Sequence, residues 1–251
     1  ADRARRAVET VAGIFDNWSV DLIFGAPPRD TLEPTLREII RVAPPHLSVY
    51  GLTWEPGTPL YGRLDDAPDD ETWLELYDTV EAMLVAGGWE HYEISNYARP
   101  GRQCRHNLVY WQNGLYEGLG PAAWRFDGIR REKNPDDLKK WITEPGVPEE
   151  SENLSDADIQ IETVIQQARL AAGIDGQKYR RRFGSTLETD FGSALRRCEE
   201  EGLLEAIPDG AGWRPTSRGF RLNNRIGLLL LEHRSSDPDM DRSNAHGMAE
   251  S

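Results

Sequence analysis

Two short apolar segments with an amphipathic helix between them constrain the fold of the first part of the chain. The segments "SVDLIFG" (residues 19–25) and "HLSVYGL" (residues 46–52) are typical of buried strands. Between them, Leu32, Leu36 and Ile39 recur at helical spacing. A strand, a helix and a strand joined by short connections form the unit of a parallel sheet. The sequence therefore predicts an α/β fold.

Further elements follow the same pattern. A helix carrying Tyr77, Val80 and Leu84 is predicted to end at Gly87, and "WEHYEIS" (residues 89–95) is the next strand candidate. Another helix is predicted over residues 2–15, and its pattern is already under way at the first residue, which is not methionine. We therefore expect the chain to be the second half of a longer protein or, as the alternative, a natural truncation with only a binding role.

The character of the sequence changes near residue 145. "TEPGVPEESENLSD" (residues 143–156) is typical of a connector rich in proline and acidic residues. Beyond it, three helical patterns, two short strands around "PDGA" and a last helix from Thr216 outline a winged-helix-like domain. We expect one domain over residues 1–144, a second over 152–232, and a disordered tail over 233–251 that has few apolar residues to bury.

Composition excludes several classes of function. The net charge is −14, so the chain repels phosphate backbones and we expect no nucleic-acid partner. The winged-helix outline raises DNA binding as a rival, but its arginines stand beside a glutamate cluster at 199–201, as on a solvated, salt-bridged surface. No apolar run approaches the ~18 residues of a membrane span. Two cysteines are too few for a disulfide framework, which favours the cytoplasm.

Cys104 lies in the densest motif of the chain, "YEISNYARPGRQCRHNLVYW" (residues 92–111). It is a weak candidate metal ligand, because the other cysteine, Cys198, is 94 positions away and only His106 is near in the sequence. It is a candidate nucleophile, because Arg102 and Arg105 would lower the pKa of its thiol. We favour a third interpretation, a half-buried structural thiol in a loop.

Two further positions are candidates for ligand contacts. Asp21 places a carboxylate in an otherwise apolar strand, which is costly unless it caps a helix, pairs with an arginine or binds a ligand hydroxyl. Thr53 belongs to "LTWEPGTPLYGR" (residues 52–63), directly after the second strand. Loops at the carboxyl ends of strands are where α/β folds bind ligands, although a plain structural turn explains this loop equally well.

Taken together, four motifs resemble one known family. They are "VDLIFGAPPRDTLE", "LSVYGLTWEPGTPLYGR", "HYEISNYARPGRQCRHNLVYWQNGLYEGLG" and "RLAAGID…RRFG", in this order. They look like the oxygen-independent coproporphyrinogen III oxidase-like family of radical S-adenosylmethionine proteins, specifically its haem-chaperone branch. The resemblance runs from about residue 2 to residue 232. It implies the C-terminal part of a partial TIM-like α/β radical S-adenosylmethionine barrel, closed at its side by the YEISN and CRHN segment, and a small winged-helix-like α+β domain.

The resemblance also implies cofactors and site residues. Asp21 matches the family's acidic contact to the ribose of S-adenosylmethionine, and Thr53 and Trp124 match positions that line the same ligand. Haem, or a partner that receives it, is expected to meet a surface formed by Arg102, Cys104, Arg105 and His106. Propionates suit bidentate contacts from the arginines.

The chain departs from the family in two places. It reads Ala122-Ala123-Trp124-Arg125 where the branch has G-A-H-S, which removes a candidate haem-ligating histidine. It also lacks the C-x₃-C-x₂-C motif that holds the family's [4Fe–4S] cluster, so by itself it is expected to be catalytically inert. The resemblance is consistent with two different functions. One is a haem chaperone that transfers haem to a haemoprotein, and the other is a coproporphyrinogen III oxidase that decarboxylates propionates by radical chemistry.

Overall fold

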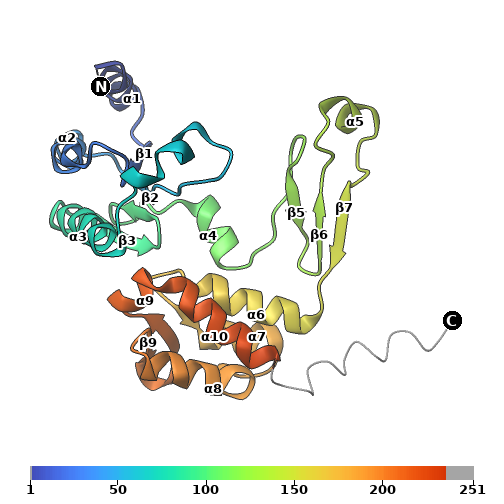
Figure 1. Cartoon of the computed structure of the whole chain (residues 1–251). Helices are drawn as coiled ribbons and strands as arrows, with labels where there is room; N and C mark the ends of the chain where they lie inside the picture. Colours follow the sequence, from blue (N-terminus) through green and yellow to red (C-terminus); the bar gives the residue numbers. More distant parts are fainter. Residues whose placement is uncertain (1, 236–251) are drawn as a thin grey trace. The chain divides into compact units, whose positions relative to one another are not determined.

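The computed structural model describes residues 2–235, and the chain divides into two compact units after Cys104 (Figure 1). This division falls earlier than the domain boundary expected between residues 144 and 152. Residues 105–153 group with the C-terminal unit because their helix and sheet pack on it, as when Asn113 bonds to Thr163.

The first unit contains the predicted parallel pair. Strand β1 (Ser19–Phe24) and strand β2 (His46–Gly51) are parallel, with Asp21 opposite Ser48, and helix α2 (Leu32–Val42) connects them. Helix α1 (Asp2–Ile14) precedes them, and helix α3 (Asp70–Ala86) follows after a 3₁₀ segment, η2 (Pro59–Asp66). The α/β prediction for this region is confirmed by this strand–helix–strand unit.

The next strand departs from a purely parallel sheet. Strand β3 (Glu90–Glu93) turns through Ile94 and Ser95 into strand β4 (Asn96–Ala98), and β4 pairs antiparallel with both β3 and β2. The strand order is β1-β2-β4-β3, which leaves β1 at one edge among the described strands. Two turn residues are too few for the crossover that a parallel neighbour requires.

The two faces of this sheet differ in polarity. Its apolar face packs against α2 and α3, and the core there contains Phe24, Leu36, Leu47, Val49, Tyr77, Val80, Leu84 and Tyr97. On the opposite face, alternation along the strands places Asp21, His46, Ser48 and Asn96. A helical layer thus covers one face, and polar side chains occupy the other.

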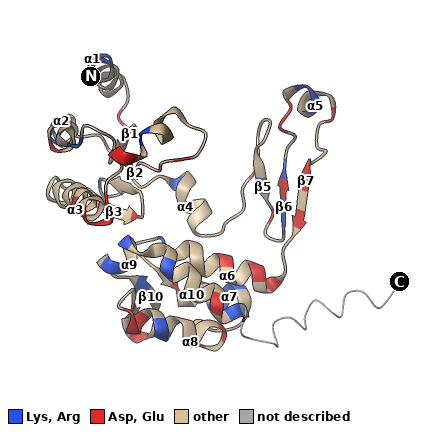
Figure 2. Cartoon of the chain, viewed as in Figure 1, with Lys and Arg blue, Asp and Glu red and all other residues tan. Residues whose placement is uncertain are grey.

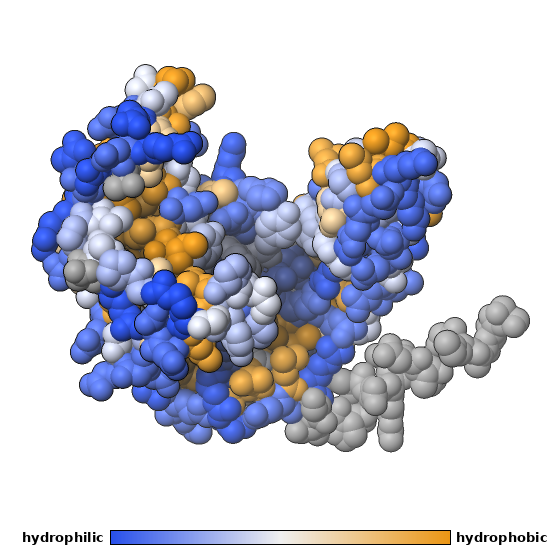
Figure 3. Space-filling view, turned by 45° about the horizontal axis from the view of Figure 1, so that its top comes forward, coloured by the Kyte–Doolittle hydropathy of each residue, from blue (hydrophilic) through white to orange (hydrophobic). Residues whose placement is uncertain are grey.

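The second unit begins with helix α4 (Arg105–Trp111) and a three-stranded antiparallel sheet, β5 (Trp124–Phe126), β6 (Arg130–Lys133) and β7 (Glu150–Asn153), with α5 (Leu138–Thr143) between β6 and β7. The prediction that residues 143–156 form only a connector is wrong, because β7 lies within it. Its four residues are all exposed, so they carry no apolar alternation by which a strand is recognised. Figure 3 shows apolar residues at the end of this sheet that carries α5, where Leu138 and Ile142 are exposed.

The remaining helices and strands of this unit surround its main core. They are α6 (Asp156–Gln167), β8 (Ile174–Asp175), α7 (Gly176–Phe183), α8 (Leu187–Glu200), β9 (Leu204–Ile207), β10 (Gly212–Pro215), α9 (Ser217–Arg221) and α10 (Asn223–Ser235). The three predicted helices, the β9–β10 hairpin and the last helical segment are all present. Strand β8 was not predicted, and it pairs with β10 to give the order β8-β10-β9.

The predicted tail over 233–251 starts too early, because residues 233–235 belong to α10. The rest of that prediction lies outside the described residues. Among the helices that the structure describes, none is both long and apolar enough to cross a membrane.

Candidate functional site

The polar face of the first sheet carries a chain of hydrogen bonds. The Ser19 Oγ lies 2.8 Å from His46 Nδ1, and the Tyr92 hydroxyl lies 2.8 Å from His46 Nε2. His46 is buried, and this burial lowers the pKa of its imidazole. A neutral ring with its proton on Nδ1 satisfies both contacts, since Nδ1 then donates to Ser19 and Nε2 accepts from Tyr92.

The same hydroxyl connects this face to the cysteine loop. The backbone N–H of Cys104 donates to the Tyr92 oxygen at 3.3 Å, so Tyr92 accepts one hydrogen bond and donates another. Beside it, the Asn96 amide donates to the buried Glu93 carboxylate. The YEISN motif is therefore the β3–β4 hairpin, and it positions the start of the CRHN motif through Tyr92.

Asp21 is exposed on β1 and is not buried, contrary to the argument that its carboxylate must meet a partner. As an edge strand, β1 exposes alternate residues, so the charge of Asp21 keeps contact with water. Within the described residues it forms neither a helix cap nor an ion pair with arginine. It borders a groove of about 700 Å³ that α1, β1 and α2 line, and its charge acts on His46 by raising the imidazole pKa against the larger effect of burial.

The other two expected contacts of S-adenosylmethionine lie in different places. Thr53 is exposed in the loop that follows β2, two residues beyond the carboxyl end of that strand. Asp21 and Thr53 therefore belong to neighbouring parallel strands of the first unit. Trp124 belongs to the second unit, where it opens β5 and is 38% exposed.

The expected haem or partner surface is basic and accessible. Arg102, Arg105 and His106 are exposed, whereas Cys104 is half-buried. Arg105 begins α4, whose basic start is visible in Figure 2. Neither arginine forms an ion pair with any residue that the structure describes, and the His106 ring packs edge-on against Tyr110, with 4.9 Å between the ring centres. These side chains are thus available to an external ligand.

The two cysteines differ in environment. Cys198 is fully buried in α8, and this burial raises the pKa of its thiol to about 11, as expected for an inert core residue. In the described part of the chain, no group of three or more His, Cys, Asp or Glu side chains is placed to hold a metal ion. Two separate cysteines do not provide the three clustered thiolates that a [4Fe–4S] cluster takes from the family's motif.

Sequence reasoning missed His46 and Tyr92 as members of this site. The signal was present in the sequence, because His46 and Ser48 alternate with apolar residues in a strand otherwise predicted as buried. Such alternation indicates a strand with one polar face. The role of Tyr92 had no comparable signal, since a tyrosine in a strand is equally typical of a core.

Comparisons with known proteins identify the relatives of this chain. The model of the HemN C-terminal domain family matches residues 154–222. The protein named Heme chaperone HemW of Bacillus subtilis is 34% identical over 230 residues, which are 87% of this chain and 60% of that protein. The chain is similar in sequence to the HemW heme chaperones. The resemblance predicted from the sequence, to the radical S-adenosylmethionine coproporphyrinogen III oxidase-like family and its haem-chaperone branch, is confirmed.

Two other relatives agree with this similarity to HemW. The bovine (Bos taurus) radical S-adenosyl methionine domain-containing protein 1, mitochondrial, is 32% identical over 259 residues, covering 91% of this chain and 57% of that protein. The solved coproporphyrinogen III oxidase HemN from Escherichia coli, a radical S-adenosylmethionine enzyme, superimposes with a TM-score of 0.73 at 18% identity, over 91% of this chain and 58% of that one. This likeness shows a shared α/β fold. The chain spans about 60% of the length of the Bacillus subtilis and Mycobacterium tuberculosis HemW proteins.

Proposed function

We propose that this chain is part of a haem chaperone that binds haem and S-adenosylmethionine and passes haem to a haemoprotein in the cytoplasm. Similarity to HemW along most of the chain supports this proposal. The observation that carries it furthest is the accessible CRHN segment, because its basic side chains have no carboxylate partners among the described residues.

Haem contacts are assigned to Arg102, Cys104, Arg105 and His106. A guanidinium pairs with a carboxylate in bidentate geometry, and haem carries two propionates. Arg102 and Arg105 are exposed, so binding a propionate would not break an existing ion pair. Tyr92 holds the backbone between them through the amide of Cys104, which limits the conformational entropy lost on binding.

Contacts to S-adenosylmethionine are assigned to Asp21, Thr53 and Trp124. The Asp21 carboxylate is exposed without a hydrogen bond to other described residues, so it suits a pair of ribose hydroxyls. Thr53 adds a hydroxyl at the carboxyl end of the neighbouring strand. The exposed face of Trp124 suits stacking against a flat ring.

The architecture of the two units is proposed from the arrangement of their strands and helices. We infer that the first unit is the C-terminal part of a partial TIM-like barrel, because β1 and β2 are parallel, their outer face is covered by helices and β1 is an open edge. We infer that α6 to α10 form a winged-helix-like domain with β9 and β10 as its hairpin. The match of the HemN C-terminal domain to residues 154–222 supports a separate C-terminal domain within the proposed range of 152–232.

The test is a haem titration followed by the Soret absorbance. We expect saturable haem binding, and the double substitution Arg102→Gln and Arg105→Gln should weaken it about tenfold or more, because two charge-assisted contacts are lost. Arg3→Gln removes an exposed arginine of α1 and serves as the matched control.

An anaerobic turnover assay of the longer protein to which this chain is proposed to belong, with coproporphyrinogen III, S-adenosylmethionine and a reductant, complements the titration. Haem binding without turnover supports a chaperone. Turnover would instead identify a coproporphyrinogen III oxidase, and haem affinity equal in the wild type and the double variant would reject the assigned surface.

A further inference from the structure

A pocket in the second unit has no role in the proposed haem chemistry. It has a volume of about 460 Å³ and lies between α6, α7 and the loop before β8. Its size is within the usual range of small-molecule sites, about 300–1,000 Å³. Leu170, Ala172 and Phe183 provide an apolar lining. The Tyr179 ring adds to this lining, since the polar end of that side chain, its hydroxyl, is already hydrogen-bonded to Asp190 at 2.7 Å.

One wall of this pocket is cationic. Lys178, Arg181 and Arg182 line it from α7, and Asp175 is the one carboxylate among the lining residues that the structure describes. Asp175 is already engaged, since it accepts from the backbone N–H of Lys178 at 2.9 Å and lies 3.6 Å from the Lys178 ammonium. Neither Arg181 nor Arg182 forms an ion pair with any described residue.

Several arginines of the second unit pair with carboxylates, whereas Arg181 and Arg182 do not. Acidic residues also outnumber basic ones in this chain, 43 to 29. Arg131 lies 2.5 Å from Glu162, Arg225 lies 2.8 Å from Glu201, and Arg234 lies 2.5 Å from Asp158. Arg181 and Arg182 both line the pocket without such partners, so they make this site locally positive on an acidic protein.

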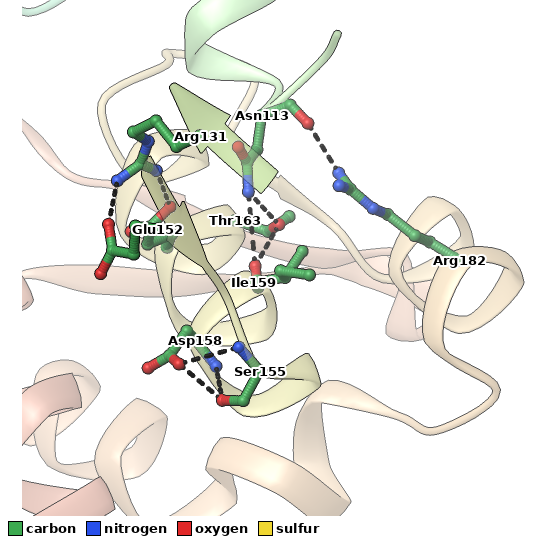
Figure 4. A network of polar contacts seen from close by, with 9 residues as sticks. Asn113, Arg131, Glu152, Ser155, Asp158, Ile159, Thr163 and Arg182 are labelled. Carbon is green, nitrogen blue, oxygen red and sulfur yellow. Dashed lines mark hydrogen bonds and ion pairs between the residues drawn. The ribbon is translucent and has the colours of Figure 1, made fainter. Parts of the chain in front are cut away.

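Arg182 is held in place by a network that leads to α6 (Figure 4). One of its N–H groups donates to the backbone carbonyl of Asn113 at 2.9 Å. Asn113 is buried, and its amide donates to the Thr163 hydroxyl at 3.0 Å. The guanidinium is thus oriented before any ligand arrives, and its remaining N–H groups are left for a ligand. Neighbouring atoms desolvate it and lower its pKa, which makes a negative partner more favourable.

A donor of another kind, Gln167, also lines the pocket. Gln167 is buried, and its carbonyl oxygen accepts from the backbone N–H of Asp175 at 3.1 Å. Its amide N–H₂ group makes no hydrogen bond to the described residues. The pocket therefore combines two guanidinium groups without carboxylate partners among the described residues, an amide donor and an apolar lining.

We propose that this pocket binds a small organic oxyanion, a carboxylate or a phosphate ester, whose charged group is held by Arg181 and Arg182 and whose apolar body packs on Leu170 and Phe183. This inference does not depend on haem binding. Guanidinium forks match carboxylate and phosphate oxygens equally well in geometry, so the shared chemistry defines the ligand class.

The experiment is isothermal titration calorimetry of the whole chain with three aromatic probes. Phenyl phosphate and benzoate carry the oxyanion, and benzamide is the neutral control with a similar body. We expect one-site binding of at least one oxyanion at millimolar concentration or below, and no measurable binding of benzamide. Binding of phenyl phosphate alone assigns a phosphate ester, and binding of benzoate alone assigns a carboxylate.

Three substitutions locate the binding. Arg181→Gln and Arg182→Gln should each weaken it about tenfold or more, because a charge-assisted hydrogen bond is lost. Arg180→Gln removes the same charge from the same helical turn outside the pocket lining and should leave the affinity unchanged. Arg181 forms no hydrogen bond or ion pair with the described residues, so we expect its substitution to test binding without affecting the fold, and melting temperatures check this for all three variants.

Two results would overturn the proposal. One is the absence of binding by both oxyanions. The other is an affinity that is the same in the wild type, Arg181→Gln and Arg182→Gln, or as high for benzamide as for the charged probes.

Discussion

The Asp21 carboxylate acts on the imidazole of His46 from the neighbouring strand of the polar sheet face. Burial disfavours the charged imidazole, whereas the exposed carboxylate of Asp21 favours it, and burial has the larger effect. A neutral ring with its proton on Nδ1 satisfies the hydrogen bonds to Ser19 and Tyr92.

This balance predicts a pH dependence of stability. The pKa of His46 lies below its ordinary value of 6.5 in the folded chain. Between that lowered pKa and 6.5, the unfolded chain binds more protons, so the free energy of unfolding should be highest above about pH 6.5 and fall as the pH drops below it. Asp21→Asn removes the charge that raises the pKa, so the pKa of His46 should fall further and the loss of stability in acid should increase.

An NMR titration of the His46 ring together with urea unfolding at neutral and acidic pH measures both effects. Asp16→Asn is the control, because Asp16 is an exposed carboxylate just before β1 without effect on His46. An unchanged His46 titration in Asp21→Asn would contradict the coupling.

The β5 strand depends on a close approach of the preceding glycine loop. A Cβ atom at Gly118 would lie 2.5 Å from the carbonyl oxygen of Trp124 and 2.7 Å from its carbonyl carbon, which is closer than real side chains come. Asn134 holds the same loop through the carbonyls of Gly118 and Gly120, at 3.0 and 2.9 Å. The glycine-rich segment thus has a structural function, because it allows the loop to lie against the strand that carries Trp124.

Gly118→Ala should therefore displace β5. We expect the free energy of unfolding to fall by roughly 1–3 kcal/mol, as for other overpacked sites, and the fluorescence of Trp124 to change. Gly62→Ala is the control, because no atom lies within 4 Å of a Cβ at Gly62 and a change below about 0.5 kcal/mol is expected. Equal stability of the two variants in urea would show that the loop has room for a side chain.

At the scale of the whole molecule, the chain contains two units with separate apolar cores. Leu36 is fully buried in the core of the first unit, and Leu195 is fully buried in that of the second. Each core is complete within its own unit, so each unit has its own source of cooperative stability.

Thermal unfolding should accordingly show two transitions. Leu36→Ala should lower the midpoint of one and Leu195→Ala that of the other, because each removal of a buried leucine costs about 2–5 kcal/mol. Differential scanning calorimetry of the wild type and both variants measures this. A single transition lowered equally by either substitution would show that the two cores unfold together.

The sequence by itself determined the elements whose apolar residues repeat with a clear period. It placed α2, α3, the parallel β1–β2 pair, and the helices and hairpin of the C-terminal part, because burying one face of a helix or strand leaves a period of 3.6 or 2 in the chain. Its motifs also indicated the family. It did not place the β3–β4 hairpin or β7. The antiparallel direction of a neighbouring strand leaves no such period in the sequence, and neither does a strand whose residues are all exposed.

Only the tertiary structure decided which polar residues meet. Ser19, His46, Tyr92 and Cys104 are separated by up to 85 positions, and Arg182 reaches the carbonyl of Asn113 across 69. Hydrogen bonds of this kind depend on distances of about 3 Å between groups that the chain brings together only after folding. A sequence pattern indicates which side chains each segment buries. It does not indicate which hydrogen-bonding partner on another strand or helix a polar side chain will meet.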